Sequence, residues 1–64
     1  MDRETILSIE PNILVSIINM KLRDFYSSLS ILCKDIGIKE KEIEDKLEGI
    51  GYKYDEDKNQ FKII

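Results

Sequence analysis

The sequence of 64 residues contains no histidine and only one cysteine, and no glycine-rich phosphate loop follows a predicted strand. Histidine is the side chain that most often exchanges protons near neutral pH, so its absence removes the commonest catalytic acid or base. The single thiol, Cys33, falls on the apolar side of a predicted helix, where it is expected to be a core residue rather than a nucleophile. We therefore predict no enzyme activity, no cofactor and no metal site.

Disulfides and long apolar runs are also missing. One cysteine cannot form an internal disulfide, whereas small secreted domains usually contain several. The apolar stretch "TILSIEPNILVSIINM" is interrupted by Glu10 and Pro11 and is too short to span a bilayer. We therefore expect a cytoplasmic protein without a membrane segment.

Positive charge is in the minority, with 10 basic against 13 acidic residues and a net charge of −3. Nucleic-acid-binding domains usually carry an excess of positive charge, so this balance argues against that role. A hydrophobic content of 42% is typical of a folded chain. The length predicts a single small domain over residues 1–64, whose limited core would gain stability from a second copy or a partner.

Cap and turn residues predict an α+β fold. Pro11 suits the first turn of a helix, and Glu10 can interact with the positive end of that helix. Ser27 or Ser28 can cap a second helix, which Gly37 ends. The predicted helices span residues 11–24, 29–36 and 40–50, after a lead-in over residues 1–10 that includes a short strand at "TILSI".

The segment "YKYDEDKNQFKI" predicts a two-stranded β-hairpin over residues 52–63. Tyr52 and Tyr54 alternate with Lys53, and the same alternation returns around Lys62 in "FKI". The intervening "DEDKN" has the polar residues of a four- or five-residue turn. Its acids lack the spacing of a calcium loop, so we interpret them as turn residues.

The stretch "CKDIGIKEKEI" resembles the helix-turn-helix consensus. Cys33 is the small residue four positions before the turn glycine, Gly37, while Ile38 and Ile43 are the aliphatic residues that fill the angle between the helices. The resemblance implies that residues 40–50 form the recognition helix and that the hairpin is wing-like. Gly51 ends this helix about one turn earlier than in winged helices.

A second resemblance covers residues 10–61. The strings "EPNILVSIINMKLRDFYSSL" and "GYKYDEDKNQF" are similar to a family of short bacterial proteins known only as a domain of unknown function. The most distinctive parts are "NMKLRD" and "GYKYDEDKNQF". This resemblance implies a stand-alone small domain, and it implies no activity, cofactor or partner.

The helix over residues 11–24 has an unusually wide apolar arc. Its polar residues gather in one narrow stripe, and apolar side chains occupy most of the remaining circumference. Because two short helices and a hairpin give little cover, we expect a homodimer through this helix, with Val15 or Ile18 facing outward. The alternative is a central core helix with a few exposed apolar side chains.

Four polar or aromatic residues are further candidates for contact with a partner. Asn19 and Arg23 lie one turn apart on the polar stripe, where Arg23 could instead pair with Asp24, Asp35 or Asp55. Tyr26 and Tyr54 are of the type enriched at interfaces, although packing in the core is the other interpretation for both.

These features favour a non-enzymatic protein-interaction module on a helix-turn-helix-like scaffold, with a homodimer or an unknown protein as partner. The alternative is a winged-helix-like DNA-binding regulator. DNA binding is disfavoured because acids outnumber lysines on the helix over residues 40–50. Solvation of this face, with the ion pairs Glu42–Lys46 and Lys41–Asp45, is its simplest explanation.

Overall fold

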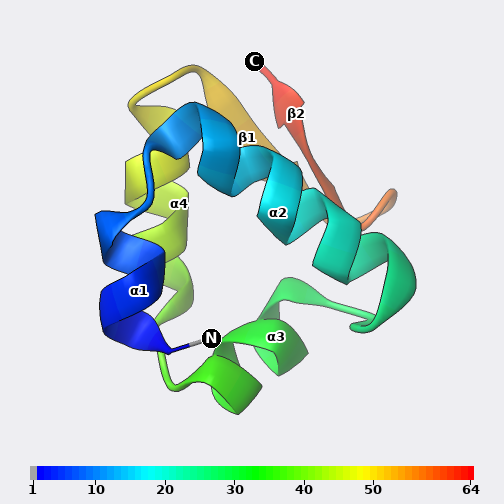
Figure 1. Cartoon of the computed structure of the whole chain (residues 1–64). Helices are drawn as coiled ribbons and strands as arrows, with labels where there is room; N and C mark the ends of the chain where they lie inside the picture. Colours follow the sequence, from blue (N-terminus) through cyan, green and yellow to red (C-terminus); the bar gives the residue numbers. More distant parts are fainter. Residues whose placement is uncertain (1) are drawn as a thin grey trace.

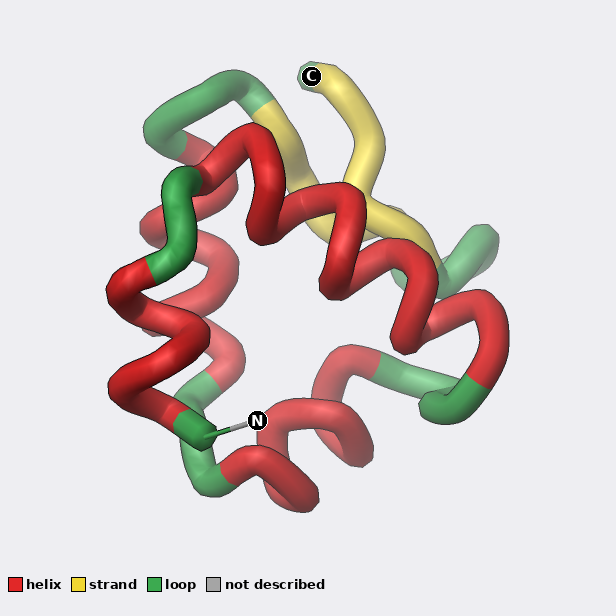
Figure 2. The backbone as a smooth tube through the Cα atoms, in the orientation of Figure 1, coloured by secondary structure: helices red, strands yellow, loops and turns green. Residues whose placement is uncertain are grey.

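The computed structural model describes residues 2–64 and has four helices followed by an antiparallel hairpin (Figures 1 and 2). The elements are α1 (Arg3–Ser8), α2 (Pro11–Asp24), α3 (Leu29–Ile36), α4 (Glu40–Glu48), β1 (Tyr52–Asp55) and β2 (Gln60–Ile63). The predicted α+β class and the two-stranded hairpin at the end of the chain are confirmed. The strand predicted at "TILSI" is wrong, because these residues belong largely to α1.

Helix α1 forms because Asp2 caps it and because Ile6 has a core to enter. The Asp2 carboxylate accepts a hydrogen bond from the Thr5 amide at 2.8 Å, and the Ile6 side chain is fully buried. The β-branched residues of "TILSI" favour a strand only where a neighbouring strand can pair with them. Here the segment packs beside α4 instead, so tertiary contacts override the local preference (Figure 1).

Two polar contacts hold α1 against α4. The Arg3 guanidinium pairs with the Glu42 carboxylate at 2.7 Å, and Lys46 Nζ donates to the Leu7 carbonyl oxygen at 2.9 Å. The predicted Glu42–Lys46 pair is therefore wrong, since each side chain has a partner on α1. The predicted pair of Lys41 and Asp45 is present at 3.6 Å.

Helices α2 and α3 have the predicted bounds and caps. Glu10 accepts from the Ile13 amide at the start of α2, and Ser28, rather than Ser27, accepts from the Ile31 amide at the start of α3. Gly37 ends α3 in the left-handed conformation with φ of 84°, which a glycine adopts without steric cost.

Helix α4 is shorter than predicted, because regular helix ends at Glu48 and a turn follows through Gly51. Gly51 has φ of 85°, and this left-handed residue reverses the chain into β1. Ile43 and Leu47 are fully buried, as their spacing predicted, while Ile50 packs against the edge of the core.

The core gathers apolar side chains from every helix and from β2. Cys33, Ile38 and Ile43 are buried around the turn at Gly37, where α3 ends. The buried set is Ile6, Leu14, Val15, Ile18, Leu22, Leu29, Leu32, Cys33, Ile38, Ile43, Leu47 and Phe61.

The hairpin lies beside α2 and α4 (Figure 1). Tyr54 pairs with Phe61 across the two strands, and Tyr52 pairs with Ile63. Asn59 closes the turn with a positive φ of 52°, a conformation that asparagine tolerates better than most residues.

Candidate functional site

Asn19, a predicted interaction residue, connects α2 to the hairpin. Its side-chain nitrogen donates to the Phe61 carbonyl oxygen at 3.0 Å, and its side-chain oxygen accepts from the Phe61 amide at 2.7 Å. The Gln60 side chain donates back to the Asn19 carbonyl oxygen at 3.0 Å. The contacts of Asn19 are therefore those of a structural residue that occupies the edge of β2.

Asn59 and Tyr54 make a second polar connection. The Asn59 side chain donates to the carbonyl oxygens of Leu22 and Tyr26, at 3.0 and 2.9 Å, and accepts from the Tyr54 hydroxyl at 2.6 Å. The same hydroxyl accepts from the Leu29 amide at 3.2 Å. Tyr54 thus joins the hairpin to the first turn of α3, which favours the packing interpretation of this residue.

The other two polar candidates lie near the end of α2. Arg23 is exposed and pairs with its neighbour Asp24 at 2.8 Å, which is one of the pairings expected from the sequence. The Tyr26 hydroxyl donates to Asp35 at 2.5 Å. This hydrogen bond raises the pKa of Tyr26. Both residues therefore have intramolecular partners.

The apolar candidates on α2 do not face solvent. Val15 and Ile18 are 5% and 0% exposed, so the prediction that they point outward is wrong. The reason is α1, a helix that the sequence patterns did not predict: its Ile6 enters the same core and supplies part of the cover for α2. The exposed apolar residues of α2 are Ile13 and Met20 instead.

Cys33 is buried between apolar side chains of the core. Burial is the largest cause that raises the pKa of its thiol to about 11, and the carboxylates of α4 add to the effect. At neutral pH very little thiolate forms, and the thiolate is the reactive species.

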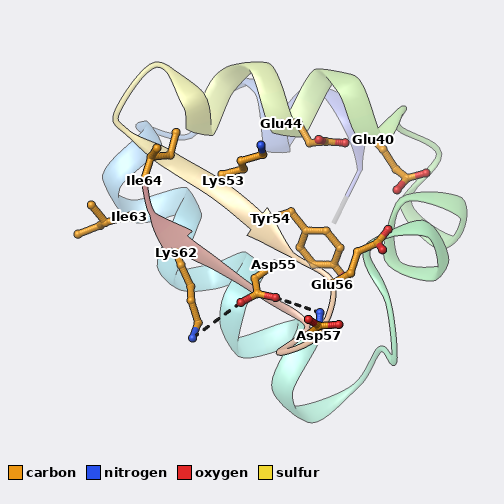
Figure 3. Close-up of a pocket in the computed structure, with 10 residues that line it drawn as sticks. All are labelled: Glu40, Glu44, Lys53, Tyr54, Asp55, Glu56, Asp57, Lys62, Ile63 and Ile64. Atoms are coloured by element: carbon orange, nitrogen blue, oxygen red, sulfur yellow. Dashed lines mark hydrogen bonds and ion pairs between the residues drawn. The ribbon is translucent and has the colours of Figure 1, made fainter.

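A groove of about 720 Å³ lies between α4 and the hairpin (Figure 3). Glu40 and Glu44, one turn apart on α4, form one wall. Its remaining lining comes from the hairpin and the residue that follows it: Lys53, Tyr54, Asp55, Glu56, Asp57, Lys62, Ile63 and Ile64.

The groove is strongly acidic. Five carboxylates and two lysines line it, which gives a net charge of −3, equal to the net charge of the whole chain. The charged residues elsewhere therefore balance one another. A positively charged group would be attracted to the groove rather than to the molecule in general.

Part of this charge is already paired. Asp55 accepts hydrogen bonds from the amides of Asp57 and Lys58, and Lys62 Nζ lies 4.0 Å from its carboxylate (Figure 3). Within residues 2–64, no ion pair involves the other four carboxylates of the groove, those of Glu40, Glu44, Glu56 and Asp57. These four can attract a cationic partner.

Both acidic segments are visible in the sequence, but nothing in the sequence brings them together. The sequence favours a solvated face for the acids of α4 and turn residues for those of "DEDKN". The separation of about a dozen residues between Glu44 and Asp55 gives no sign that the segments share a groove. The signal that the sequence offers is that both segments contain more acidic than basic residues.

The family model for the domain of unknown function DUF4250 matches residues 8–61. The chain belongs to this family. No curated protein and no solved structure matches the chain. The DUF4250 match extends from the end of α1 to Phe61 and therefore includes α2, α3, α4 and the hairpin turn.

The two most distinctive strings of the family resemblance meet in the structure. "NMKLRD" supplies Asn19, and "GYKYDEDKNQF" supplies Tyr54, Asn59, Gln60 and Phe61, which make the polar connections described above. In this DUF4250 domain these strings fix the hairpin on α2, and so they position one wall of the acidic groove.

Two further properties concern residues 2–64 only. No helix there combines the length and apolar character needed to cross a membrane. No cluster of three or more histidine, cysteine, aspartate or glutamate side chains there has a geometry that could hold a metal ion.

Proposed function

We propose that this DUF4250 domain is a non-enzymatic protein-interaction module that binds a positively charged segment of a partner in the groove between α4 and the hairpin. The observation that carries the proposal is the location of charge: the groove has the same net charge as the whole chain, −3. Such a surface selects partners by sign and accelerates their encounter.

Both walls of the groove are held in fixed positions. Ile43 and Leu47 anchor α4 in the core, and the Asn19 and Asn59 side chains tie the hairpin to α2. A preformed surface loses less conformational entropy on binding than a flexible one. This rigidity supports recognition by a groove that keeps its shape.

A calorimetric titration tests the proposal. The probe is an octapeptide of alternating lysine and threonine, and the comparison peptide has glutamate in place of lysine. We expect the lysine peptide alone to bind, with an affinity that falls as salt is added, because salt screens the exposed charges.

A pair of charge-neutralised variants locates the binding. Glu40→Gln with Glu44→Gln removes two carboxylates from the groove, and the matched control, Glu4→Gln with Glu48→Gln, removes two exposed carboxylates outside it. The first should weaken binding about tenfold, if each lost charge contributes roughly 0.7 kcal/mol, and the control should change it much less. Equal losses in both would contradict binding in the groove.

Self-association is a second candidate, favoured by two side chains on α2. Ile13 and Met20 are 58% and 37% exposed and lie seven residues apart, which places them on the same face. A second copy could cover this face in a two-fold pair. Sedimentation of the wild type beside Ile13→Glu is the test: a dimer that the substitution dissociates supports the pair, and a monomer at all concentrations excludes it.

DNA binding remains the alternative for the α3–α4 scaffold, because Cys33, Gly37, Ile38 and Ile43 fit the helix-turn-helix pattern. Glu40 and Glu44 on the exposed side of α4 would repel phosphate groups. Tight and salt-sensitive binding of duplex DNA would replace the interaction proposal with a regulator.

A further inference from the structure

The outer edge of β1 has main-chain groups that β2 does not use. In an antiparallel pair, residues alternate between positions bonded to the partner strand and positions whose amide and carbonyl point away from it. The Ile64 amide donates to the Gly51 carbonyl oxygen at 2.9 Å, which makes this pair a bonded one. Because bonded and non-bonded pairs alternate along the register, Lys53 and Lys62 also form a pair that exchanges main-chain hydrogen bonds. The pairs Tyr52–Ile63 and Tyr54–Phe61 are then the non-bonded ones.

The contact between Asn19 and Phe61 gives the same assignment independently. Both main-chain groups of Phe61 bond to the Asn19 side chain, so they point away from β1. Its cross-strand neighbour Tyr54 must then direct its own amide and carbonyl away from β2, on the opposite side of the hairpin.

The two edges of the hairpin therefore differ. Asn19 bonds to both main-chain groups of Phe61 on the β2 edge, whereas no side chain or loop within residues 2–64 hydrogen-bonds to the main chain of Tyr52 or Tyr54. Tyr54 also lines the acidic groove, and β1 runs away from α4 toward the hairpin turn (Figure 3). The unpaired edge thus adjoins the part of the groove that opens between α4 and the turn.

We propose that the basic segment binds in extended conformation as a third strand along the β1 edge, with its main chain bonded to Tyr54, the residue of that edge that lines the groove. This inference rests on the proposed function and specifies how the partner binds. Main-chain hydrogen bonds in such strand addition provide affinity, and alternate side chains provide specificity.

Charge and spacing identify the occupant as a segment with a basic residue at every second position. Glu40 and Glu44 lie four residues apart on α4, which separates their Cβ atoms by about 6 Å. Alternate side chains of a strand are about 7 Å apart, so two successive basic side chains can reach both carboxylates. An acidic segment would meet five carboxylates in the same groove.

Backbone methylation separates strand pairing from simple charge attraction. The lysine–threonine octapeptide is compared with two analogues, one N-methylated at its odd positions and the other at its even positions. Each analogue keeps every charge but loses the amide donors of one strand edge. We expect at least one analogue to bind more than tenfold more weakly than the parent peptide, and we expect hydrogen exchange at the Tyr54 amide to slow when the parent binds.

The outcomes distinguish the two proposals. If the parent and both analogues bind equally well, and Tyr54 exchange is unchanged, the charged groove stands and strand addition is wrong. If no lysine peptide binds, the proposed function fails and strand addition fails with it. If a glutamate peptide also binds, and added salt lowers its affinity as much as that of the lysine parent, the proposed positive charge of the occupant is wrong.

Discussion

The Asn19 side chain bonds to the main chain of Phe61 through both its oxygen and its nitrogen, at 2.7 and 3.0 Å. In this position the side-chain amide of Asn19 makes the two hydrogen bonds that the main chain of a residue in an adjacent strand would make. It satisfies the outward-facing main-chain groups of Phe61 on the β2 edge, which would otherwise be open to pairing with another chain. Helix α2 therefore covers the β2 edge at Phe61, whereas no hydrogen bond within residues 2–64 reaches the outward-facing main chain of Tyr52 or Tyr54 on the other edge.

The first prediction concerns this contact. Asn19→Ala leaves the amide and carbonyl of Phe61 without their partners in a partly buried position, which should lower the free energy of unfolding by about 2 kcal/mol. Ser16→Ala is the control, since Ser16 is exposed on the same polar stripe. Urea denaturation followed by circular dichroism measures both, and equal stability of the two variants would show that the contact does not hold the hairpin.

The second prediction tests the cover that α1 provides. Ile6→Val removes one methylene from a fully buried side chain, whereas Ile13→Val makes the same change in a side chain that is 58% exposed. We expect the first to cost about 1 kcal/mol and the second much less. The measurement is the melting temperature of the two variants. Similar melting temperatures would mean that α1 does not pack into the core.

The third prediction is a pH dependence at the contact between α1 and α4. The hydrogen bond from Arg3 is the largest cause that lowers the pKa of Glu42 from its ordinary value of 4.5. A carboxylate with a lowered pKa in the folded state stabilises the fold above its ordinary pKa, and this contribution is lost as the pH falls through the folded-state value.

Glu42→Gln should accordingly be less stable than the wild type near neutral pH, and the difference should shrink as the solution is acidified below 4.5. Hydrogen bonds also lower the pKa values of Asp2 and Glu10, the capping residues of α1 and α2, so acid should weaken these two caps as well. Denaturant titrations at several pH values measure the difference. If the difference in stability between the variant and the wild type stays constant on acidification, the pKa of Glu42 does not contribute to stability in this way.

The fourth prediction is that Cys33 is chemically inert in the native state. Its pKa rises from 9.0 to about 11, which reduces the thiolate at a given pH by about 100-fold. Iodoacetamide should therefore modify the folded protein at least that much more slowly than the denatured protein. Comparable rates in the two states would indicate an accessible, ionised thiol.

Local sequence signals predicted most of the helices correctly, because their end residues act through adjacent main-chain groups. Pro11, Ser28 and Gly37 each mark a boundary that the structure has. The signal failed at α1, where "TILSI" has strand-forming residues but no strand beside it. Whether such a segment is a helix or a strand depends on what it packs against, and that is a tertiary property.

The candidate site was harder to predict for the same reason. Asn19 is a candidate for contact with a partner by its place on the polar stripe, yet Phe61, to which it bonds, lies 42 residues away in the chain. Val15 and Ile18 were expected outside because the cover from Ile6 was not foreseen. Both acidic segments of the groove were visible in the sequence, but only the folded chain places Glu40 and Glu44 opposite the hairpin.

The most direct test of the central claim is to map the binding of the lysine–threonine octapeptide by amide chemical shifts in a nitrogen-15-labelled sample. We predict that the largest changes fall on residues 54–57 and around Glu40 and Glu44, and that they diminish when salt is added. Changes centred on α2 would contradict the assignment of the groove as the binding site. The absence of changes at every peptide concentration would contradict it as well.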